Sequence, residues 1–207
     1  MSAAGAFYLQ LTAKRKQFTL PRCILVVRST NNHSRGFCGL ELIAKTGIAD
    51  AINRMPAGIR SSRGAIAETI ENNVRSKIIK EQLNDPAFYE KMSELLDGII
   101  AARRSRAIEY EEYLKRIAEL AKRVEAGQSE DTPQQVDTPG RRALYNNLNK
   151  DSDLALKIDQ VVKSTRHDGW RGVQSREQGI KRALYEVRHT EAEVERIFLI
   201  VKQQREY

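Results

Sequence analysis

The chain has 207 residues, of which 41% are hydrophobic, 30% charged and 6% aromatic, with five prolines and two cysteines. This composition is typical of a helix-rich globular protein with a charged surface, and it excludes collagen-like, mucin-like and disulfide-scaffold proteins. The longest apolar runs hold only about five residues, whereas a membrane-spanning helix needs about 18 or more. We therefore expect no membrane span and no membrane partner.

The net charge of +8 is unevenly distributed along the chain. Residues 1–40 hold six Lys and Arg residues and no Asp or Glu, so the remaining residues are nearly neutral. Both cysteines, Cys23 and Cys38, lie in the same basic stretch, with no CxxC spacing and no group of histidines beside them. This pattern predicts neither a zinc site nor a disulfide framework. Such sparse cysteine usage favours a cytoplasmic protein.

Residues 1–39 form a basic segment that differs in composition from the rest of the chain. It has a short strand-like run at Cys23–Arg28 and no helical stripe. Its apolar stretch precedes the basic cluster, which is the reverse of a secretory signal. An organellar transit peptide and a phosphate-binding basic arm remain alternatives. We favour an irregular, poorly ordered leader that is not native to the helical protein.

From Leu40 onward the apolar residues recur every three or four positions, which predicts an all-α protein. We expect a bundle-like domain of about seven to eight helices. The expected helices cover residues 40–54, 64–82, 86–104, 107–126 and 175–188, together with a short helix after Pro139, one after Asp151 and one after Thr190. The third of these helices is expected to bury a face formed by Phe88, Met92, Leu95, Leu96 and Ile99.

Several helix ends have recognisable capping residues. Asp85 before Pro86 predicts a capped helix start, because the carboxylate can accept an otherwise unpaired amide hydrogen of the first turn. Gly127 is expected to end a helix in the left-handed conformation. Thr190 and Glu193 have the spacing of a capping box, in which each side chain accepts from the other's backbone amide.

A polar, turn-rich segment divides the helical region. Residues 128–138, with the sequence QSEDTPQQVDT, have no hydrophobic periodicity and are expected to form a linker or long surface loop. The sequence therefore predicts a helical subdomain at 40–127 and a second one at 139–207 that packs on the first.

No motif for catalysis, cofactor binding or metal binding is recognisable. Ala44-Lys45-Thr46 lacks the glycines of a nucleotide-binding loop, and no Glu is followed by Lys two residues later, as common metal-dependent nucleases require. The three histidines, His33, His167 and His189, are scattered along the chain. We expect no catalytic, cofactor-binding or metal-binding residue.

Three basic clusters are candidates for binding phosphate. They are Arg103, Arg104 and Arg106, then Arg141 and Arg142, and finally Lys181 and Arg182. Arginines in the first turn of a helix interact unfavourably with the helix dipole, so no local interaction explains Arg141 and Arg142 at this position. Their placement slightly favours an anionic partner. The alternative is an ordinary solvated face paired with nearby glutamates. Trp170 could stack on a base, but a lone Trp at a turn between helices favours a core position.

Two ordered blocks of sequence resemble a known family. The first runs from Ala67-Glu68-Thr69-Ile70-Glu71-Asn72-Asn73-Val74-Arg75 through Asn84-Asp85-Pro86-Ala87-Phe88-Tyr89-Glu90-Lys91-Met92-Ser93-Glu94-Leu95-Leu96 to Tyr110-Glu111-Glu112-Tyr113-Leu114. The second joins Ala155-Leu156-Lys157-Ile158-Asp159, Asp168-Gly169-Trp170-Arg171-Gly172 and Ile180-Lys181-Arg182-Ala183-Leu184-Tyr185. Over residues 40–207 the combination is similar to the C-terminal helical region of the restriction (R) subunit of type I restriction-modification enzymes.

The resemblance implies a piece of a larger ATP-dependent deoxyribonuclease, whose nuclease and motor domains have no counterpart here. ATP and magnesium are expected only for that full-length parent. In the family, the helical region is thought to pack on the motor domains and to attach the R subunit to the modification subunit. The resemblance implies structural roles for Asn72, Asn73, Asp159, Asp168, Trp170, Gly172 and Tyr185.

The leading hypothesis is therefore a docking module without catalytic activity of its own, whose partners are the modification subunit and the motor domains. The alternative is a free-standing DNA-binding module that places its basic clusters on phosphates. Nuclease activity of the isolated chain is a third and remote hypothesis, because no catalytic residue of the family has a matching position.

Overall fold

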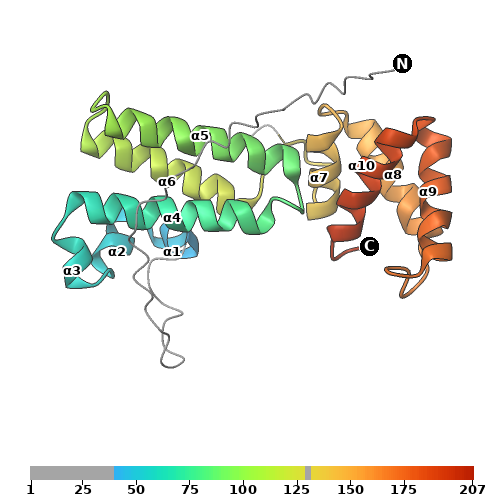
Figure 1. Cartoon of the computed structure of the whole chain (residues 1–207), viewed down its shortest axis with the longest axis horizontal. Coiled ribbons are helices and arrows are strands. Elements are labelled where there is room, and N and C mark those ends of the chain that lie inside the picture. The colour runs from blue at the N-terminus through green and yellow to red at the C-terminus, as the bar shows by residue number, and fades with distance from the viewer. Residues whose placement is uncertain (1–39, 129–131) are drawn as a thin grey trace, which may run out of the picture. The chain divides into compact units, whose positions relative to one another are not determined.

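The computed structural model describes residues 40–128 and 132–207 (Figure 1). These residues form ten helices and no strand, which confirms the all-α prediction. The helices are α1 (Leu40–Thr46), α2 (Ile48–Asn53), α3 (Ala57–Arg60), α4 (Arg63–Glu81), α5 (Pro86–Arg104), α6 (Tyr110–Ala126), α7 (Pro139–Asn147), α8 (Ser152–Thr165), α9 (Gln174–Arg188) and α10 (Glu191–Gln203). The expected leader at 1–39, with its strand-like run, lies outside the described residues, as do residues 129–131 of the expected linker.

The expected number of seven to eight helices was too low. The single helix expected at 40–54 is divided into α1 and α2, because Gly47 has a φ of 91°, a left-handed value that interrupts the helical backbone. A further four-residue helix, α3, follows Pro56. The helix expected from residue 107 begins only at Tyr110, after Arg106 adopts a φ of 56°.

Most of the predicted helix caps are confirmed. The Asp85 carboxylate accepts from the Phe88 amide at 3.2 Å, and Asp151 caps α8 in the same way through the Leu154 amide at 3.0 Å. Gly127 ends α6 with a φ of 60°. The capping box at Thr190 was wrong, because the Thr190 side chain makes no cap bond and Glu193 pairs instead with Arg188.

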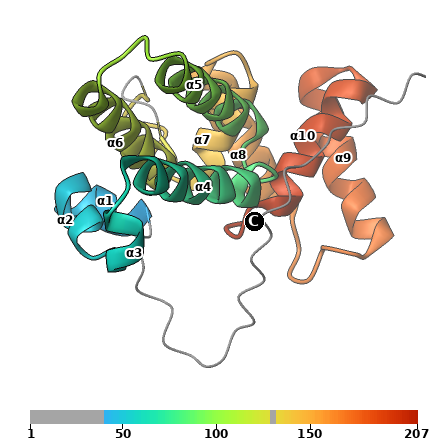
Figure 2. The same ribbon diagram turned by 60° about the vertical axis from the view of Figure 1, so that its left-hand side comes forward.

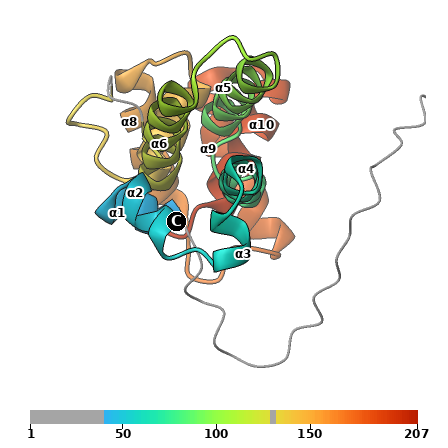
Figure 3. The ribbon, with the colours of Figure 1, turned by 90° about the vertical axis from the view of Figure 1, so that its left-hand side faces the viewer.

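One apolar core lies among the first six helices. Helices α4, α5 and α6 pack on one another, and α1 packs on α6 (Figures 2 and 3). Their buried side chains include the predicted stripe of α4, namely Ile66, Ile70, Val74 and Ile78. On α5 the buried face is displaced from the expected one: Tyr89 is buried, whereas Leu95 is 40% exposed.

A second apolar core lies among α7, α8, α9 and α10. Helices α7 and α8, α8 and α9, α9 and α10, and α7 and α10 pack in pairs, while α5 packs against α7. Trp170 is buried in this core with its ring 5.9 Å from that of Phe198, which confirms the core position predicted for it. The division of the chain into two separate subdomains stays a prediction.

Trp170→Ala is expected to lower the free energy of unfolding by about 3–5 kcal/mol, because it leaves a large cavity in the second core. The matched control is Tyr185→Ala. Tyr185 is 45% exposed, and its replacement should change the free energy of unfolding by less than about 0.5 kcal/mol. Urea denaturation followed by circular dichroism measures both. Similar values for the two variants would contradict the core position of Trp170.

Candidate functional site

In the basic cluster at the end of α5, one arginine forms an internal ion pair and the other two face solvent. Arg103 Nε and a terminal nitrogen donate to the two oxygens of the Glu71 carboxylate, at 2.8 and 3.1 Å. Tyr113 Oη donates to the same carboxylate at 3.1 Å. Arg104 and Arg106 are exposed, and their side chains have no hydrogen bond or ion pair with the part of the chain that the structure describes. Within this cluster, these two arginines are therefore the unpaired cations at the surface.

The two arginines of α7 have polar partners within the protein that the sequence did not reveal. Arg141 Nε donates to the buried Asp159 carboxylate at 2.8 Å, and another Arg141 nitrogen donates to Asp137 at 2.9 Å. Arg142 donates to Gln128 at 2.9 Å, while its Nε is buried without a hydrogen-bond partner among the described residues. The expected anionic partner of Arg141 is thus supplied by the protein itself.

The cluster on α9 likewise contains one paired and one unpaired cation. Lys181 Nζ donates to both oxygens of Glu195 on α10, at 2.6 and 2.8 Å, and lies 4.7 Å from the centre of the Phe198 ring. Arg182 is exposed, and its side chain has no hydrogen bond or ion pair with residues 40–128 or 132–207. The three sequence clusters therefore do not converge on one described site.

The loop between α8 and α9 is fixed by its own polar side chains. Trp170 anchors it in the core, and Arg171 donates to the carbonyl oxygens of Lys202 and Gln204 at the end of α10. Gly172 has a φ of 79° and donates its amide to Glu177 at 2.8 Å. The exposed Asp168 contributes its carbonyl oxygen, which accepts from Arg176 at 2.6 Å.

The remaining residues that carry the resemblance differ in burial. Asn72 is exposed, and Asn73 is half-buried. Tyr185 is exposed on α9, with its ring 6.2 Å from that of His189. Among these residues, Asp159 and Trp170 are the ones held inside the second core region.

Asp159 is a buried carboxylate that joins three segments. It accepts from Arg141 on α7, from Lys163 on its own helix, and from Tyr207 Oη at 2.8 Å. Burial acts to raise its pKa, but the hydrogen bonds from Lys163, Arg141 and Tyr207 outweigh burial and hold the pKa below its usual value. The carboxylate therefore stays charged and stabilises this junction at neutral pH.

Asp85 is a second buried carboxylate, and it lies between the two apolar cores. Besides capping α5, it accepts from the Asn147 amide at 2.8 Å and from the Asn146 amide at 2.6 Å, both on α7. Burial is the largest influence on its pKa, which rises to about 6 although these hydrogen bonds and Arg142 act to lower it. Among the described residues, no cation forms an ion pair with this carboxylate to offset its burial.

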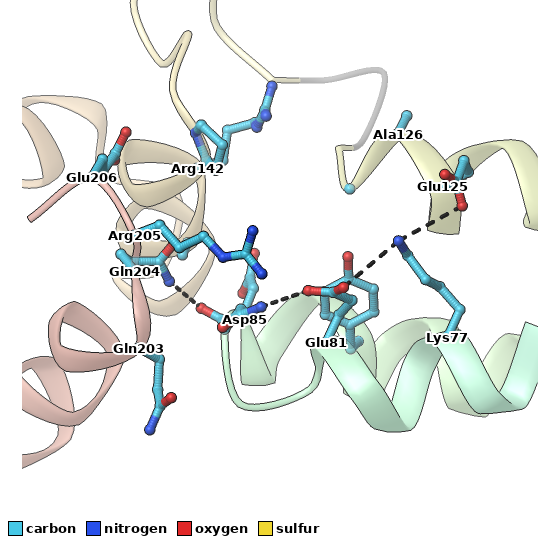
Figure 4. A pocket seen from close by; sticks show the side chains of 15 residues that line it. Lys77, Glu81, Asp85, Glu125, Ala126, Arg142, Gln203, Gln204, Arg205 and Glu206 are labelled. Atoms are coloured by element: carbon cyan, nitrogen blue, oxygen red, sulfur yellow. Dashed lines mark hydrogen bonds and ion pairs between the residues drawn. The ribbon is translucent and has the colours of Figure 1, made fainter. Parts of the chain in front are cut away.

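A cleft of about 580 Å³ lies beside Asp85 (Figure 4). It is lined by α4, α5, the end of α6, α7 and the residues that follow α10. Lys77 Nζ lies 3.6 Å from Glu81 and 3.8 Å from Glu125, and the Arg205 side chain points into the cleft. Gln204 donates to the Asn84 carbonyl oxygen at 2.6 Å, so the cleft is closed at one side by a link between α10 and the α4–α5 turn.

The sequence predicted Asp85 only as a helix cap and Asp159 only as a structural residue implied by the resemblance, and it gave no role to Glu71, Asn147 or Gln204. One signal of a buried polar network was nevertheless present. Glu71 follows Ala67 and precedes Val74 on the buried stripe of α4, and Asp159 interrupts the buried stripe of α8 in the same way. A carboxylate on an apolar stripe indicates a buried polar network. Asn147 and Gln204 gave no comparable signal, because their partner at residues 84 and 85 is distant in the sequence.

Within residues 40–128 and 132–207 no three His, Cys, Asp or Glu side chains are grouped closely enough to hold a metal ion. None of the described helices combines the length and the apolar character that crossing a membrane requires. Comparison of the chain with protein-family models, with curated proteins and with solved structures gave no match.

The stability contributed by Asp85 should depend on pH in an unusual direction. Because its pKa is raised to about 6 in the folded state, this contribution is fully present below the unfolded value of 3.8 and is lost as the pH rises through 6. Relative to Asp85→Asn, the wild type should lose about 2 kcal/mol of unfolding free energy between pH 4 and pH 7. Urea titrations of both proteins across this range measure the difference.

Asp151→Asn is the matched control, since it alters the same type of helix cap at an exposed position. Running it at the same pH values separates the loss of a cap from the burial of the Asp85 carboxylate. A wild type that becomes more stable relative to Asp85→Asn as the pH rises would contradict the raised pKa.

Asp159→Asn should destabilise the protein by about 2–3 kcal/mol at pH 7, because it leaves Arg141 and Lys163 without their buried partner. Asp137→Asn removes the exposed partner of the same arginine and should cost less than about 0.5 kcal/mol. Thermal and urea denaturation test both variants. Equal losses would show that burial of Asp159 is unimportant to the junction.

Proposed function

We propose that this chain is a helical docking module related to the C-terminal region of the type I restriction R subunit. It binds the modification subunit or the motor domains of a restriction complex through the outer faces of its helices. The role we assign to it is attachment, and nuclease and ATPase activity belong to other parts of such an enzyme.

The observation that carries this proposal is where the resembling residues lie. Asp85, Phe88 and Tyr89 from the first block form the capped, buried start of α5 at the junction of the two cores. Asp159 and Trp170 from the second block hold α7, α8 and α10 together. These residues determine packing, which supports a shared helical architecture and a shared attachment role, whereas Asn72, Asp168 and Tyr185 of the same blocks are exposed.

The alternative function, a DNA-binding module, has fewer cations available to it than the sequence predicted. Arg103, Arg141 and Lys181 are each engaged by a carboxylate of the protein. Arg104, Arg106 and Arg182 remain exposed on α5, the following turn and α9, and these three favour some contact with phosphate. Three separated cations give weak, salt-sensitive binding, because affinity for DNA scales with the number of phosphates neutralised.

Binding measured at two salt concentrations separates the two functions. The labelled full chain is titrated with the modification complex and motor subunit from the same organism, and separately with duplex DNA, at about 0.1 and 0.5 M salt. We expect binding to the protein subunits to persist at the higher salt, because buried apolar contacts are insensitive to screening.

The variant Arg104→Ala/Arg106→Ala/Arg182→Ala provides the control for phosphate contact. It should leave binding to the protein subunits unchanged while abolishing any residual DNA binding. Tight DNA binding that falls steeply with salt, together with no binding to the subunits, would replace docking by the DNA-binding function. Incubation of the chain with DNA, magnesium and ATP should give no cleavage, and cleavage by the purified chain would overturn the attachment role.

A further inference from the structure

The cleft beside Asp85 is lined by cations whose hydrogen-bonding capacity the protein itself does not use. Arg205 points into the cleft (Figure 4), and its guanidinium has no hydrogen bond or ion pair with the part of the chain that the structure describes. Lys77 Nζ lies 3.6 Å from Glu81 and 3.8 Å from Glu125, whereas a charge-assisted hydrogen bond is about 2.7–2.9 Å long. Two cations of the cleft therefore have no hydrogen-bonded acceptor within residues 40–128 and 132–207.

Tyr89 supplies a third donor from the buried side of the cleft. Its side chain is only 7% exposed, and its Oη forms no hydrogen bond with any described residue. Oη lies beside Gly127, where an added Cβ atom would be 3.4 Å from it, and both residues line the cleft. Burial raises the pKa of Tyr89 to about 12, so the hydroxyl keeps its proton at neutral pH. Such a hydroxyl can be satisfied only by a group inside the cleft.

The carboxylates of the cleft are mostly engaged by the protein. Glu81, Asp85 and Glu206 each accept at least one hydrogen bond. Glu125, near the end of α6, accepts none from the described residues and has only its 3.8 Å contact with Lys77. The unmatched groups of the cleft are thus three donors, of which two are cationic, and one carboxylate.

These unmatched groups favour an organic carboxylate over other anions. A carboxylate can accept two parallel hydrogen bonds from a guanidinium and further ones from a hydroxyl or an ammonium group. Phosphate carries up to two negative charges, and it would be repelled more strongly by the four carboxylates that line the cleft together with three basic side chains. The free carboxylate of Glu125 favours a ligand that also carries a hydrogen-bond donor.

The size of the cleft suits a small molecule. Its volume of about 580 Å³ lies within the range of about 300–1,000 Å³ that is usual for ligand sites. Apolar surface is also present in the lining, for example at Ala126, Pro139 and Ala143. A compact organic body can therefore contact the walls while its charged group reaches the donors.

We propose that this cleft binds a small organic carboxylate that carries a hydroxyl or amino group. Arg205, Lys77 and Tyr89 hold the carboxylate of the ligand, and Glu125 accepts from its donor. The site goes beyond the attachment role and does not depend on it. Because the lining comes from α4 and α6 as well as from α7 and the segment after α10, a bound molecule contacts both helical cores and stabilises the folded chain.

A matched set of probes tests the charge and the donor separately. The probes are meta-hydroxybenzoate, its neutral amide meta-hydroxybenzamide, benzoate without the hydroxyl, and phenyl phosphate. Each is titrated into the isotope-labelled full chain to about 10 mM and followed by amide NMR shifts. We expect meta-hydroxybenzoate to bind at least about tenfold tighter than the amide and phenyl phosphate, and about threefold tighter than benzoate.

Conservative substitutions then locate the contact. Arg205→Gln should weaken binding of meta-hydroxybenzoate by about tenfold, because it removes the charge and the paired donors. Tyr89→Phe should weaken it by about fivefold while keeping the ring in the core. The matched controls are Arg182→Gln and Tyr185→Phe, which change exposed residues on α9 and should leave the affinity unchanged. Unchanged unfolding midpoints without ligand verify that the variants fold.

The position of the NMR shifts and the order of affinities decide the outcome. Shifts at the Ala126 and Gly127 amides and a raised unfolding midpoint with ligand are expected, since both residues line the cleft. The proposal is overturned by the absence of saturable binding of meta-hydroxybenzoate, by equal binding of the amide, or by tighter binding of phenyl phosphate. A wild-type affinity in Arg205→Gln, or shifts confined to helices outside the cleft, would also overturn it.

Discussion

The contact between two apolar cores depends on a few hydrogen bonds at one turn. Asn84 and Asp85, between α4 and α5, accept from Gln204 after α10 and from Asn146 and Asn147 on α7. The groups are largely buried, so each unpaired donor or acceptor would cost free energy comparable to a lost hydrogen bond. Helices that pack well within their own core are thereby held in one arrangement relative to the other core.

The two buried carboxylates of this region differ in how the free-energy cost of burying a charge is offset. Asp159 receives two cations and a phenol, and its pKa is held below the usual value. Asp85 receives only amides, and its pKa rises to about 6. A charged carboxylate without a paired cation is less favourable in a buried position, which makes the Asp85 junction the one whose stability changes nearest neutral pH.

The distribution of charge bears directly on function. Internal carboxylates engage Arg103, Arg141 and Lys181, so these residues stabilise the fold in the isolated chain. Arg104, Arg106 and Arg182 are exposed instead, and their side chains have no hydrogen bond or ion pair with the described residues. The cations open to a partner are therefore fewer than the sequence clusters predicted.

Most of the helices could be predicted from the sequence, because hydrophobic spacing, the Asp85 and Asp151 caps and the Gly127 stop are local features. It also placed Trp170 in a core. It did not predict the break at Gly47, the failure of the Thr190 cap or the partner of Arg141. The packing of the helices brings Arg141 to Asp159 and brings Asp85 to Asn146 and Asn147. Such pairs join residues far apart in the chain, and helical periodicity carries no information about which helices come together.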